Sequence, residues 1–264
     1  MVARKRFGQH FLEAAWVAKV VKAIHPTPTD EFIEIGPGRA ALTTPLAASA
    51  RHVTAFEIDR DLVAALRVSA PENLTVVEGD FLESDWLLKH PPSTPIRVAA
   101  NLPYNVASPI LFKLIDLFDT GVPIADATLM LQREVVDRLV ARPSTKEYGV
   151  LTVLAGLSAD VERLLMLPPG AFRPMPRVQS ALVRMRFHPP HPTPANRSQF
   201  GAMVTAIFTR RRKTLENALQ AYRPGEGHDI PAALRAVGID GRRRPETLEI
   251  AEFVRLSDAL VAVL

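Results

Sequence analysis

The chain alternates between short runs of apolar, often β-branched residues and longer segments whose apolar residues recur at helical spacing. The runs have the length of buried strands, and the segments between them have the length of helices. Strands are expected at 32–36, 53–57, 74–78, 97–101 and 127–132, with helices near 39–50, 60–69 and 106–118. Strands that alternate with helices in this way predict an α/β fold with a parallel, doubly wound sheet.

The last third of the chain follows a different pattern. Residues 181–187 alternate with a period of two, which predicts a late, partly exposed strand. The next segment, HPPHPTPANR, is rich in proline, which removes backbone donors and disfavours helix in the residue before it. Only helical patterns follow, near 199–220, 230–237 and 246–263. We therefore expect an α/β domain at 1–188, a Pro-rich linker at 189–197 and a small all-helical domain at 198–264.

Composition excludes several classes of function. The 264 residues are 47% hydrophobic and 23% charged, which is typical of a folded globular protein. No apolar stretch is long enough to span a bilayer, and the first residues lack a signal-peptide core, so a cytoplasmic protein is expected. The absence of cysteine excludes disulfides, thiolate metal sites and cysteine nucleophiles. His188 and His191 have no third ligand nearby in the sequence, so no metal site is expected.

The charges are unevenly distributed along the chain. Residues 1–24 carry a net charge of +4, residues 25–187 carry −3 and residues 188–264 carry +3. Basic ends around an acidic middle fit an enzyme that binds a polyanion, although ordinary surface solvation would also produce them. The run Arg210, Arg211, Arg212 and Lys213, expected on the first C-terminal helix, predicts with Arg242–Arg244 a phosphate-binding face for RNA.

A first candidate site is built from the ends of three expected strands. In EIGPGRAALT (34–43), Gly36 and Gly38 permit a tight turn and the close approach of a ligand. The spacing G-x-G-x-x-A matches the dinucleotide-binding fingerprint, which suits NAD enzymes and S-adenosylmethionine enzymes equally well. Glu57 ends the second strand, at the separation from the glycine loop where a carboxylate can accept both hydroxyls of a ribose.

The third strand ends in EGDF (78–81), over the same crevice. Asp80 is placed there to accept a hydrogen bond from an adenine amino group, while Ile58 or Phe81 flanks the ring. Together the three strand ends predict an adenosyl ligand without deciding which one. An NAD dehydrogenase stays open at this point, although it would need a proton-relay residue that the sequence does not reveal.

The loop NLPYN (101–105) predicts the chemistry of a second site. The lone pair of an adenine amino group is delocalised into the ring, and two acceptors on its two N–H bonds would turn it outward. The Asn101 side-chain oxygen and the Leu102 carbonyl can be those acceptors, and Pro103 holds Leu102 extended. Tyr104 offers a ring face for the base. Methylation at a pyrimidine carbon would need a thiol, which this chain lacks. A plain turn with a buried tyrosine is the alternative.

Nine motifs in one order carry a specific resemblance. They are RKRFGQHFL (4–12), EIGPGRAALT, FEIDRDL (56–62), EGDF, NLPYN, LQREVVDRLVA (131–141), KEYG (146–149), PPGAFRPMPRVQSA (168–181) and FTRRRKTLENAL (208–219). Together they resemble the ribosomal RNA adenine N6,N6-dimethyltransferase family. The similarity is greatest to its bacterial small-subunit branch, the kasugamycin-resistance enzymes.

The resemblance implies a Rossmann-like class I methyltransferase sheet with a helical RNA-docking domain, S-adenosyl-L-methionine as methyl donor and no metal. It implies that a monomer, without membrane contact, dimethylates N6 of two adjacent adenosines in the 3′-terminal hairpin loop of small-subunit ribosomal RNA. The substrate would be a pre-assembled small ribosomal subunit. The implied cofactor residues are His10, Leu12, Gly36, Gly38, Glu57, Ile58, Asp80, Phe81 and Asn101.

The same resemblance implies that Phe172 closes on the target base opposite Tyr104. The sequence departs from the family at His10, where asparagine is common, at Ala40, where glycine is frequent, and at Gly170, where serine is frequent.

Two rival functions come from the same features. The large-subunit adenine methyltransferases that confer macrolide resistance share the fold, but FGQHFL, NLPY and AFRPMPRV argue against them. A mainly non-catalytic ribosome-assembly or nucleic-acid-binding factor is the other rival. An intact NLPY loop together with Glu57 and Asp80 argues against a pure binder.

Overall fold

The computed structural model describes residues 10–222 and 229–262, and it divides into two compact units. The first unit holds the chain up to Val136 together with Asp160–Phe187, and the second holds Asp137–Ala159 together with the chain from His188 onward. The second unit resumes at His188, next to the expected boundary, but it also holds residues 137–159, which were expected in the α/β domain. The difference arises because Val153 and Leu157 are buried in the hydrophobic core of the second unit.

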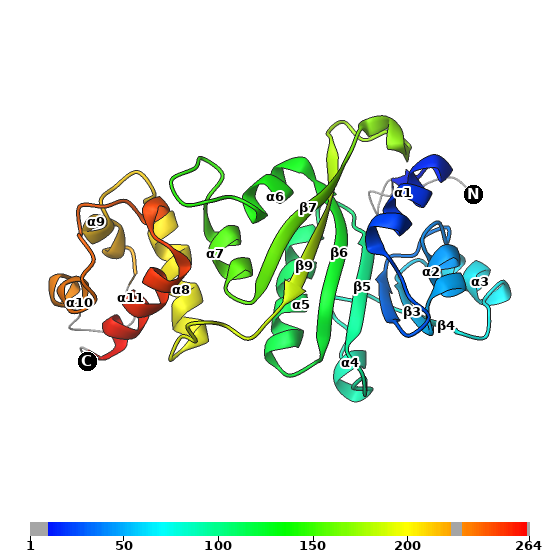
Figure 1. Ribbon diagram of the computed structural model, residues 1–264, viewed down its shortest axis with the longest axis horizontal. Coiled ribbons are helices and arrows are strands. Elements are labelled where there is room, and N and C mark those ends of the chain that lie inside the picture. The colour runs from blue at the N-terminus through cyan, green and yellow to red at the C-terminus, as the bar shows by residue number, and fades with distance from the viewer. Residues whose placement is uncertain (1–9, 223–228, 263–264) are drawn as a thin grey trace. The chain divides into compact units, whose positions relative to one another are not determined.

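A seven-stranded sheet forms the centre of the first unit (Figure 1). Its strands are β2 (Glu31–Ile35), β3 (His52–Glu57), β4 (Leu74–Glu78), β5 (Ile96–Asn101), β6 (Ile124–Gln132), β7 (Ala159–Leu167) and β9 (Ser180–Phe187). They lie in the order β4-β3-β2-β5-β6-β9-β7. The first five are parallel to their neighbours, whereas β9 runs antiparallel to β6. The sheet is thus Rossmann-like, as expected, but it is mixed rather than wholly parallel.

The strand expected at 181–187 is β9 (Ser180–Phe187), and it is partly exposed as predicted, since Arg186 is exposed and Arg184 and Phe187 are half-buried. Strand β9 lies inside the sheet between β6 and β7, and most of its residues are buried. Its period-two pattern arises because Arg184 has specific partners: its guanidinium donates to the carbonyls of Ala23 and Ile24, at 2.6 and 3.1 Å. These carbonyls end a helix and have no intrahelical donor, so the arginine satisfies them.

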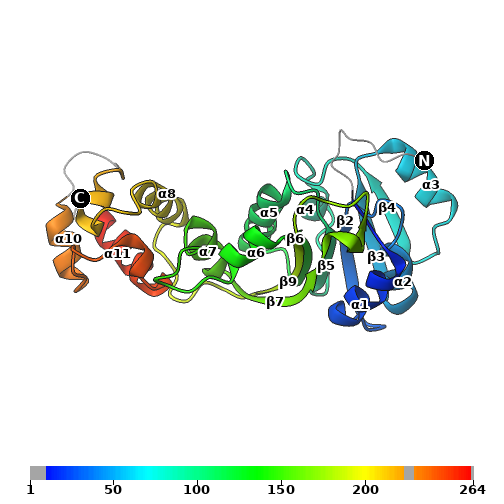
Figure 2. The same ribbon diagram turned by 90° about the horizontal axis from the view of Figure 1, so that it is seen from above.

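Helices cover both faces of the sheet. They are α1 (Ala14–Ile24), α2 (Thr43–Ser49), α3 (Arg60–Val68), α4 (Trp86–Lys89), α5 (Ala107–Asp119) and α6 (Arg133–Leu139), which crosses the division between the units. Figure 2 shows α1 and α5 on opposite faces. Helix α1, which the sequence pattern did not reveal, packs Val20 and Ile24 against Phe32 of β2 and Met130 of β6. Among the described residues, no helix has the length and apolarity needed to cross a membrane.

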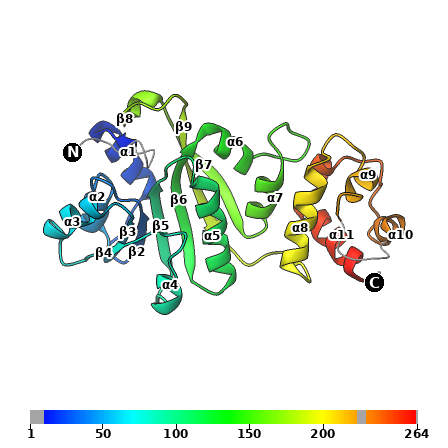
Figure 3. The same ribbon diagram turned by 180° about the vertical axis from the view of Figure 1, so that it is seen from behind.

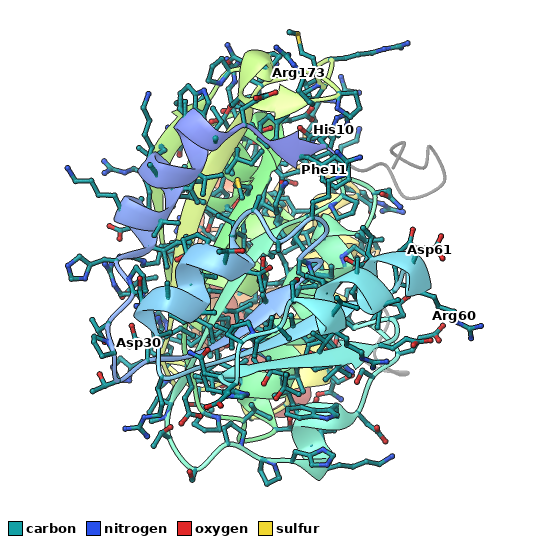
Figure 4. The ribbon with its side chains drawn as sticks, turned by 90° about the vertical axis from the view of Figure 1, so that its right-hand side faces the viewer. His10, Phe11, Asp30, Arg60, Asp61 and Arg173 are labelled. Atoms are coloured by element: carbon teal, nitrogen blue, oxygen red, sulfur yellow. The ribbon has the colours of Figure 1, made fainter. Side chains whose placement is uncertain are left out.

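A two-stranded ladder ties the start of the described chain to the PPGAFRPMP segment. Strand β1 (Phe11–Leu12) pairs antiparallel with β8 (Phe172–Arg173), which follows the short 3₁₀ helix η2 (Pro169–Ala171). An ion pair of 3.1 Å between Arg173 and Glu13 adds to the ladder. Figure 4 shows His10, Phe11 and Arg173 near one another in the first unit. The first part of the RKRFGQHFL motif, 4–9, lies outside the described residues.

The second unit is helical, as expected (Figure 3). It contains α7 (Val150–Gly156), α8 (Arg197–Phe208), α9 (Leu215–Leu219), α10 (Ile230–Ala236), η3 (Pro245–Thr247) and α11 (Ile250–Ala262). The single helix expected over 199–220 is two helices, and residues 210–213 form the turn between them. This turn closes where the Lys213 N–H donates to the Arg210 carbonyl at 2.8 Å.

Candidate active site

A cavity opens at the carboxyl ends of four neighbouring strands, β4, β3, β2 and β5. Ligands of open α/β sheets bind at this edge. Most of the residues expected from the sequence line it: His10, Leu12, Gly36, Gly38, Glu57, Ile58, Asp80, Phe81, Asn101, Leu102, Pro103 and Tyr104. The fold therefore brings the two predicted sites, the adenosyl site and the NLPY loop, into one cavity.

The register of the sheet places three polar side chains on one face. Glu34 of β2 pairs with Ala55 of β3 on one side and with Ala99 of β5 on the other. Glu57 lies two positions beyond Ala55, and Asn101 lies two positions beyond Ala99. Because every second side chain of a strand points to the same face, Glu34, Glu57 and Asn101 all lie on the face covered by α1 and α2.

The glycine loop after β2 needs its glycines for their backbone conformation. Gly36 and Gly38 have φ angles of +70° and +58°, in the left-handed region that favours glycine. A Cβ on Gly36 would meet nothing within 4 Å, whereas one on Gly38 would lie 3.2 Å from the Phe11 ring. Ala40 also has a left-handed φ of +63°, at the position where the sequence departs from the family's glycine. The loop thus leaves open space beside its backbone for a ligand.

Glu57 is held by the backbone around it. Its side chain is buried, and its two carboxylate oxygens accept the N–H groups of Gly38, at 3.0 Å, and Asp59, at 2.9 Å. Each oxygen keeps a lone pair, so the carboxylate can also accept from a ligand hydroxyl. This geometry suits the role expected for Glu57 toward a ribose.

Asp80 and its neighbours form the next part of the wall. One carboxylate oxygen of Asp80 accepts the Leu82 N–H at 2.9 Å. Phe81 is buried and packs edge-on against the Phe56 ring, at 5.3 Å between centroids. Ile58 lines the cavity and is 46% exposed. Of the two residues expected to flank an adenine, Ile58 therefore offers the more accessible surface.

The NLPY loop has two acceptors directed by their surroundings. The Asn101 amide donates to the His10 carbonyl at 2.8 Å, which assigns its nitrogen and leaves its oxygen as an acceptor. Within the described part of the chain, no donor contacts this oxygen or the Leu102 carbonyl. The Tyr104 hydroxyl lies 2.8 Å from the Ser180 hydroxyl, and burial raises the pKa of the Tyr104 phenol. The phenol therefore stays neutral at physiological pH.

His10 joins the two loops that frame the cavity. Its ring stacks on Tyr104, with centroids 5.6 Å apart and an interplanar angle of 28°. Its Nδ1 donates to the Pro174 carbonyl at 2.7 Å, and its own carbonyl receives the Asn101 amide. The sequence predicted His10 as a cofactor residue but not these contacts, because they join segments that are far apart along the chain.

Phe172 does not line the cavity. Its side chain is 1% exposed and belongs to the core cluster that includes Leu12, Met130 and Leu182. The pairing of β1 with β8 sets Leu12 opposite Phe172 and buries it. The expectation that Phe172 faces a target base opposite Tyr104 is therefore not met in this structure.

Glu34 is the cavity residue that the sequence reading missed. It lines the cavity at 2% exposure, and neither its Oε2 nor the nearby Thr43 hydroxyl has a hydrogen bond of normal geometry. Burial raises the pKa of Glu34 to about 8; the Thr43 hydroxyl opposes this shift, and the charge of Glu57 adds to it. The available signal was a carboxylate within an apolar strand, since Glu is rarely buried without a partner.

The free energy of unfolding of the protein should depend on pH through the titration of Glu34. Between pH 4.5 and about 8 the native state keeps a proton that the unfolded chain releases, so the free energy of unfolding should fall as pH rises. The slope from this group is at most about 1.4 kcal/mol per pH unit. Urea unfolding of the wild type and Glu34→Gln from pH 5 to 8 measures it. The stability difference between them should shift steadily in favour of the variant, and a constant difference would contradict the assignment.

The basic run in the second unit is only partly available to a ligand. Arg210, Arg211, Arg212 and Lys213 line a second cavity. However, Arg211 forms an ion pair with Glu246 and donates to the Lys146 and Thr145 carbonyls, at 2.5 and 3.1 Å. The prediction that Arg211 contacts phosphate is therefore not supported, because the side chain already holds a neighbouring loop. Arg212 and Lys213 are exposed, and no partner contacts their side chains within the described chain.

The second expected basic group, Arg242–Arg244, also has fewer side chains available to a ligand than the sequence suggests. Arg243 pairs with both carboxylate oxygens of Glu252, at 2.6 and 3.0 Å, and Arg242 pairs with Asp240 at 3.1 Å. Arg244 is exposed. Arg210 is exposed as well, with a single long hydrogen bond of 3.4 Å to the Asn217 carbonyl. The cations best placed for a polyanion are thus Arg210, Arg212, Lys213 and Arg244.

The donors and acceptors of the first cavity fit an adenosyl methyl donor. The glycine loop provides space, Glu57 and Asp80 provide acceptors, and Glu34 provides a buried carboxyl group whose Oε2 lacks a partner. Among the residues that the structure describes, no three His, Asp or Glu side chains are grouped to hold a metal ion.

Comparisons with known proteins agree with this site. Residues 1–261 match the family model described as ribosomal RNA adenine dimethylase. The ribosomal RNA small subunit methyltransferase A of Acinetobacter baylyi is 44% identical, covering 98% of this chain and 93% of that protein. The same-named protein of Bordetella avium is 43% identical, covering 98% and 96%.

Two solved structures share the fold over nearly the whole chain. A dimethyladenosine transferase from Plasmodium falciparum superposes with a TM-score of 0.77 at 24% identity, covering 94% of this chain and 96% of that one. The 23S rRNA methyltransferase ErmE superposes with a TM-score of 0.68 at 28% identity, covering 95% and 99%. On the nearly full-length family match and the high identity to the two bacterial relatives, this chain belongs to the ribosomal RNA adenine dimethylase family.

Proposed function

We propose that this protein uses S-adenosyl-L-methionine to dimethylate N6 of two adjacent adenosines in the 3′-terminal hairpin loop of small-subunit ribosomal RNA. It would act in the cytoplasm as a monomer, without a metal, on a pre-assembled small subunit. The observation that carries the proposal is the pair of unoccupied acceptors, Asn101 Oδ1 and the Leu102 carbonyl, in a cavity whose lining fits an adenosyl group.

The two acceptors explain how a poor nucleophile becomes reactive. Hydrogen bonds from both N6–H groups to Asn101 and Leu102 favour a tetrahedral nitrogen whose lone pair points away from the ring. The methyl donor supplies an electrophilic methyl group on a sulfonium. Asn101 is itself fixed by the His10 carbonyl, so its acceptor oxygen is oriented before the substrate arrives. A preorganised acceptor costs no reorientation in the transition state.

The small-subunit substrate is favoured over its rivals by the comparisons. The relatives that are 44% and 43% identical carry a small-subunit name, whereas the large-subunit methyltransferase ErmE is 28% identical. A purely binding factor would not need the acceptors Asn101 and Glu57 in one cavity. Labelled methyl donor should be incubated with undermethylated small subunits, with large subunits and with naked small-subunit RNA, and the label mapped. Label on the two adjacent loop adenosines of the small subunit alone is expected, and label on the large subunit would overturn the choice of substrate.

The exposed cations of the second unit should contribute to RNA affinity. We expect Arg212→Ala with Lys213→Ala to weaken binding to small subunits and to reduce the slope of log K against log salt. Each lost phosphate contact lowers this slope by about 0.7–0.9. Binding measured over a series of salt concentrations tests the prediction, and an unchanged slope would show that these side chains do not contact phosphate.

Arg211→Ala is the matched comparison for this experiment. It removes the same charge from the same turn, but its main loss should be the ion pair with Glu246 and the two carbonyl contacts. We therefore expect a lower Tm with a smaller change in the salt slope. S-adenosylhomocysteine binding should survive in all of these variants, because the cavity lies in the other unit.

A further inference from the structure

The order of the strands places Glu34 between the two ends of the proposed cofactor site. Strand β2 lies between β3, which ends in Glu57, and β5, which ends in Asn101. The register sets all three side chains on the same face of the sheet. Glu34 is 2% exposed, lines the cavity and has a buried oxygen without a hydrogen-bond partner. A buried carboxyl group in this state is costly unless a ligand or a proton compensates it.

The chemistry of the proposed methyl donor identifies a compensating group. Its sulfonium sulfur is bonded both to the ribose and to the transferred methyl. If Glu57 holds the ribose and Asn101 borders the methyl, the sulfur would be held between them, on the side of Glu34. This step rests on the proposed function. We infer that Glu34 is the counter-charge of the sulfonium, releasing a proton when the charged methyl donor binds and regaining one when the neutral product remains.

The charged groups around Glu34 do not already provide this compensation. On β3 it faces Glu57, which is also an acid, and Asp80 lies farther along the same cavity wall. Thr43, at the start of α2, contributes a neutral hydroxyl. Arg39, in the glycine loop, lines the cavity, but its guanidinium lies over the Phe11 ring, 4.3 Å from the centroid. From the segment before β1, the cavity also receives His10, whose ring is committed to Tyr104 and Pro174.

The proposed exchange is balanced over one methyl transfer. The bond from sulfur to methyl breaks as the bond from N6 to methyl forms, the sulfur keeps the bonding electrons, and N6 loses one proton. The cofactor changes from a cation to a neutral thioether. Glu34 then takes up a proton, since a buried carboxylate without its counter-ion is unfavourable. A carboxylate attracts a nearby cation strongly at an effective dielectric constant near 20. The site would therefore prefer the methyl donor to the product.

The affinities of S-adenosylmethionine and S-adenosylhomocysteine from pH 6 to 9 test this inference in the wild-type protein. The two ligands share their amino and carboxylate groups and differ by one methyl and one charge, so other titrations cancel in the ratio of affinities. Because burial raises the pKa of Glu34 to about 8, the ratio should rise up to about tenfold per pH unit below pH 8 and level off above it. Calorimetry at pH 7 in two buffers of different ionisation enthalpy should show about one proton released by S-adenosylmethionine and none by S-adenosylhomocysteine.

Two variants separate Glu34 from other causes. Glu34→Gln removes the titration and keeps the shape, so the ratio should become independent of pH. Glu31→Gln changes the same residue type at the other end of β2, outside the cavity, and should behave as the wild type. A ratio that does not change with pH in the wild type, or that still changes in Glu34→Gln, overturns the inference. If Glu34→Gln does not fold, the wild-type ratio and proton release alone decide it. Failure of both ligands to bind would instead refute the proposed function.

Discussion

Asn101→Ala should lower kcat on undermethylated small subunits by on the order of 10²–10³-fold, which is what loss of one preorganised hydrogen-bonding group costs in other active sites. The substitution removes one of two acceptors that act most strongly as the adenine amino group becomes tetrahedral. An interaction that strengthens in the transition state is lost from kcat more than from substrate affinity. Single-turnover assays at saturating cofactor measure the effect directly, and near-normal turnover would refute the role assigned to the NLPY loop.

The Asn101 side chain has an acceptor oxygen and a donor nitrogen, and a second variant shows which of the two the reaction needs. Its oxygen faces the cavity as an acceptor, while its nitrogen donates to the His10 carbonyl. Asn101→Asp keeps an acceptor but loses this donor. If the acceptor carries catalysis, Asn101→Asp should retain clearly more activity than Asn101→Ala. Equal losses in both variants would show that the contact with His10, and not the acceptor, is what the reaction requires.

Glu57→Ala should weaken S-adenosylhomocysteine binding by about 100-fold, since hydrogen bonds to a charged group contribute about 1.5–3 kcal/mol. The variant loses the ribose acceptor and also leaves the Gly38 and Asp59 N–H groups without their partner. An unsatisfied buried donor costs about 1–3 kcal/mol, so a lower Tm without ligand is expected as well. Because a ligand that binds only the native state stabilises it, the Tm increase produced by S-adenosylhomocysteine should nearly vanish. Titration calorimetry gives the affinity itself.

Glu78→Gln is the matched control for this experiment. Glu78 pairs in register with Glu57 on the adjacent strand, but its side chain is 38% exposed, pairs with Arg60 at 3.0 Å and lies outside the cavity. Its substitution should leave cofactor affinity near the wild-type value. Equal losses in the two variants would mean that Glu57 acts through general stability. Stabilisation by NAD and not by S-adenosylhomocysteine would refute the cofactor assignment.

The strands of the first half of the chain, and the chemical groups at their ends, could be predicted from the residues alone. The five strands expected in the first half of the chain lie close to their expected positions, because the buried centre of a sheet selects continuous apolar runs. Gly36, Glu57, Asp80 and Asn101 could be placed in one crevice because carboxyl ends of parallel strands meet at one edge. Glycine admits left-handed backbone angles that other residues avoid, so the tight turn at Gly36 and Gly38 was also predictable.

Features that depend on contacts between distant segments could not be predicted from the sequence, because the fold is what brings those segments together. The burial of Phe172 follows from a ladder with Leu12, near the other end of the domain's sequence, and Arg211 is occupied by Glu246 and by the carbonyls of Thr145 and Lys146. Residues 137–159 join the second unit through packing that no local pattern reveals. The protonation of Glu34 has the same origin. A carboxyl group has an ordinary pKa in the unfolded chain, and its pKa is raised only where folding removes water without supplying a partner.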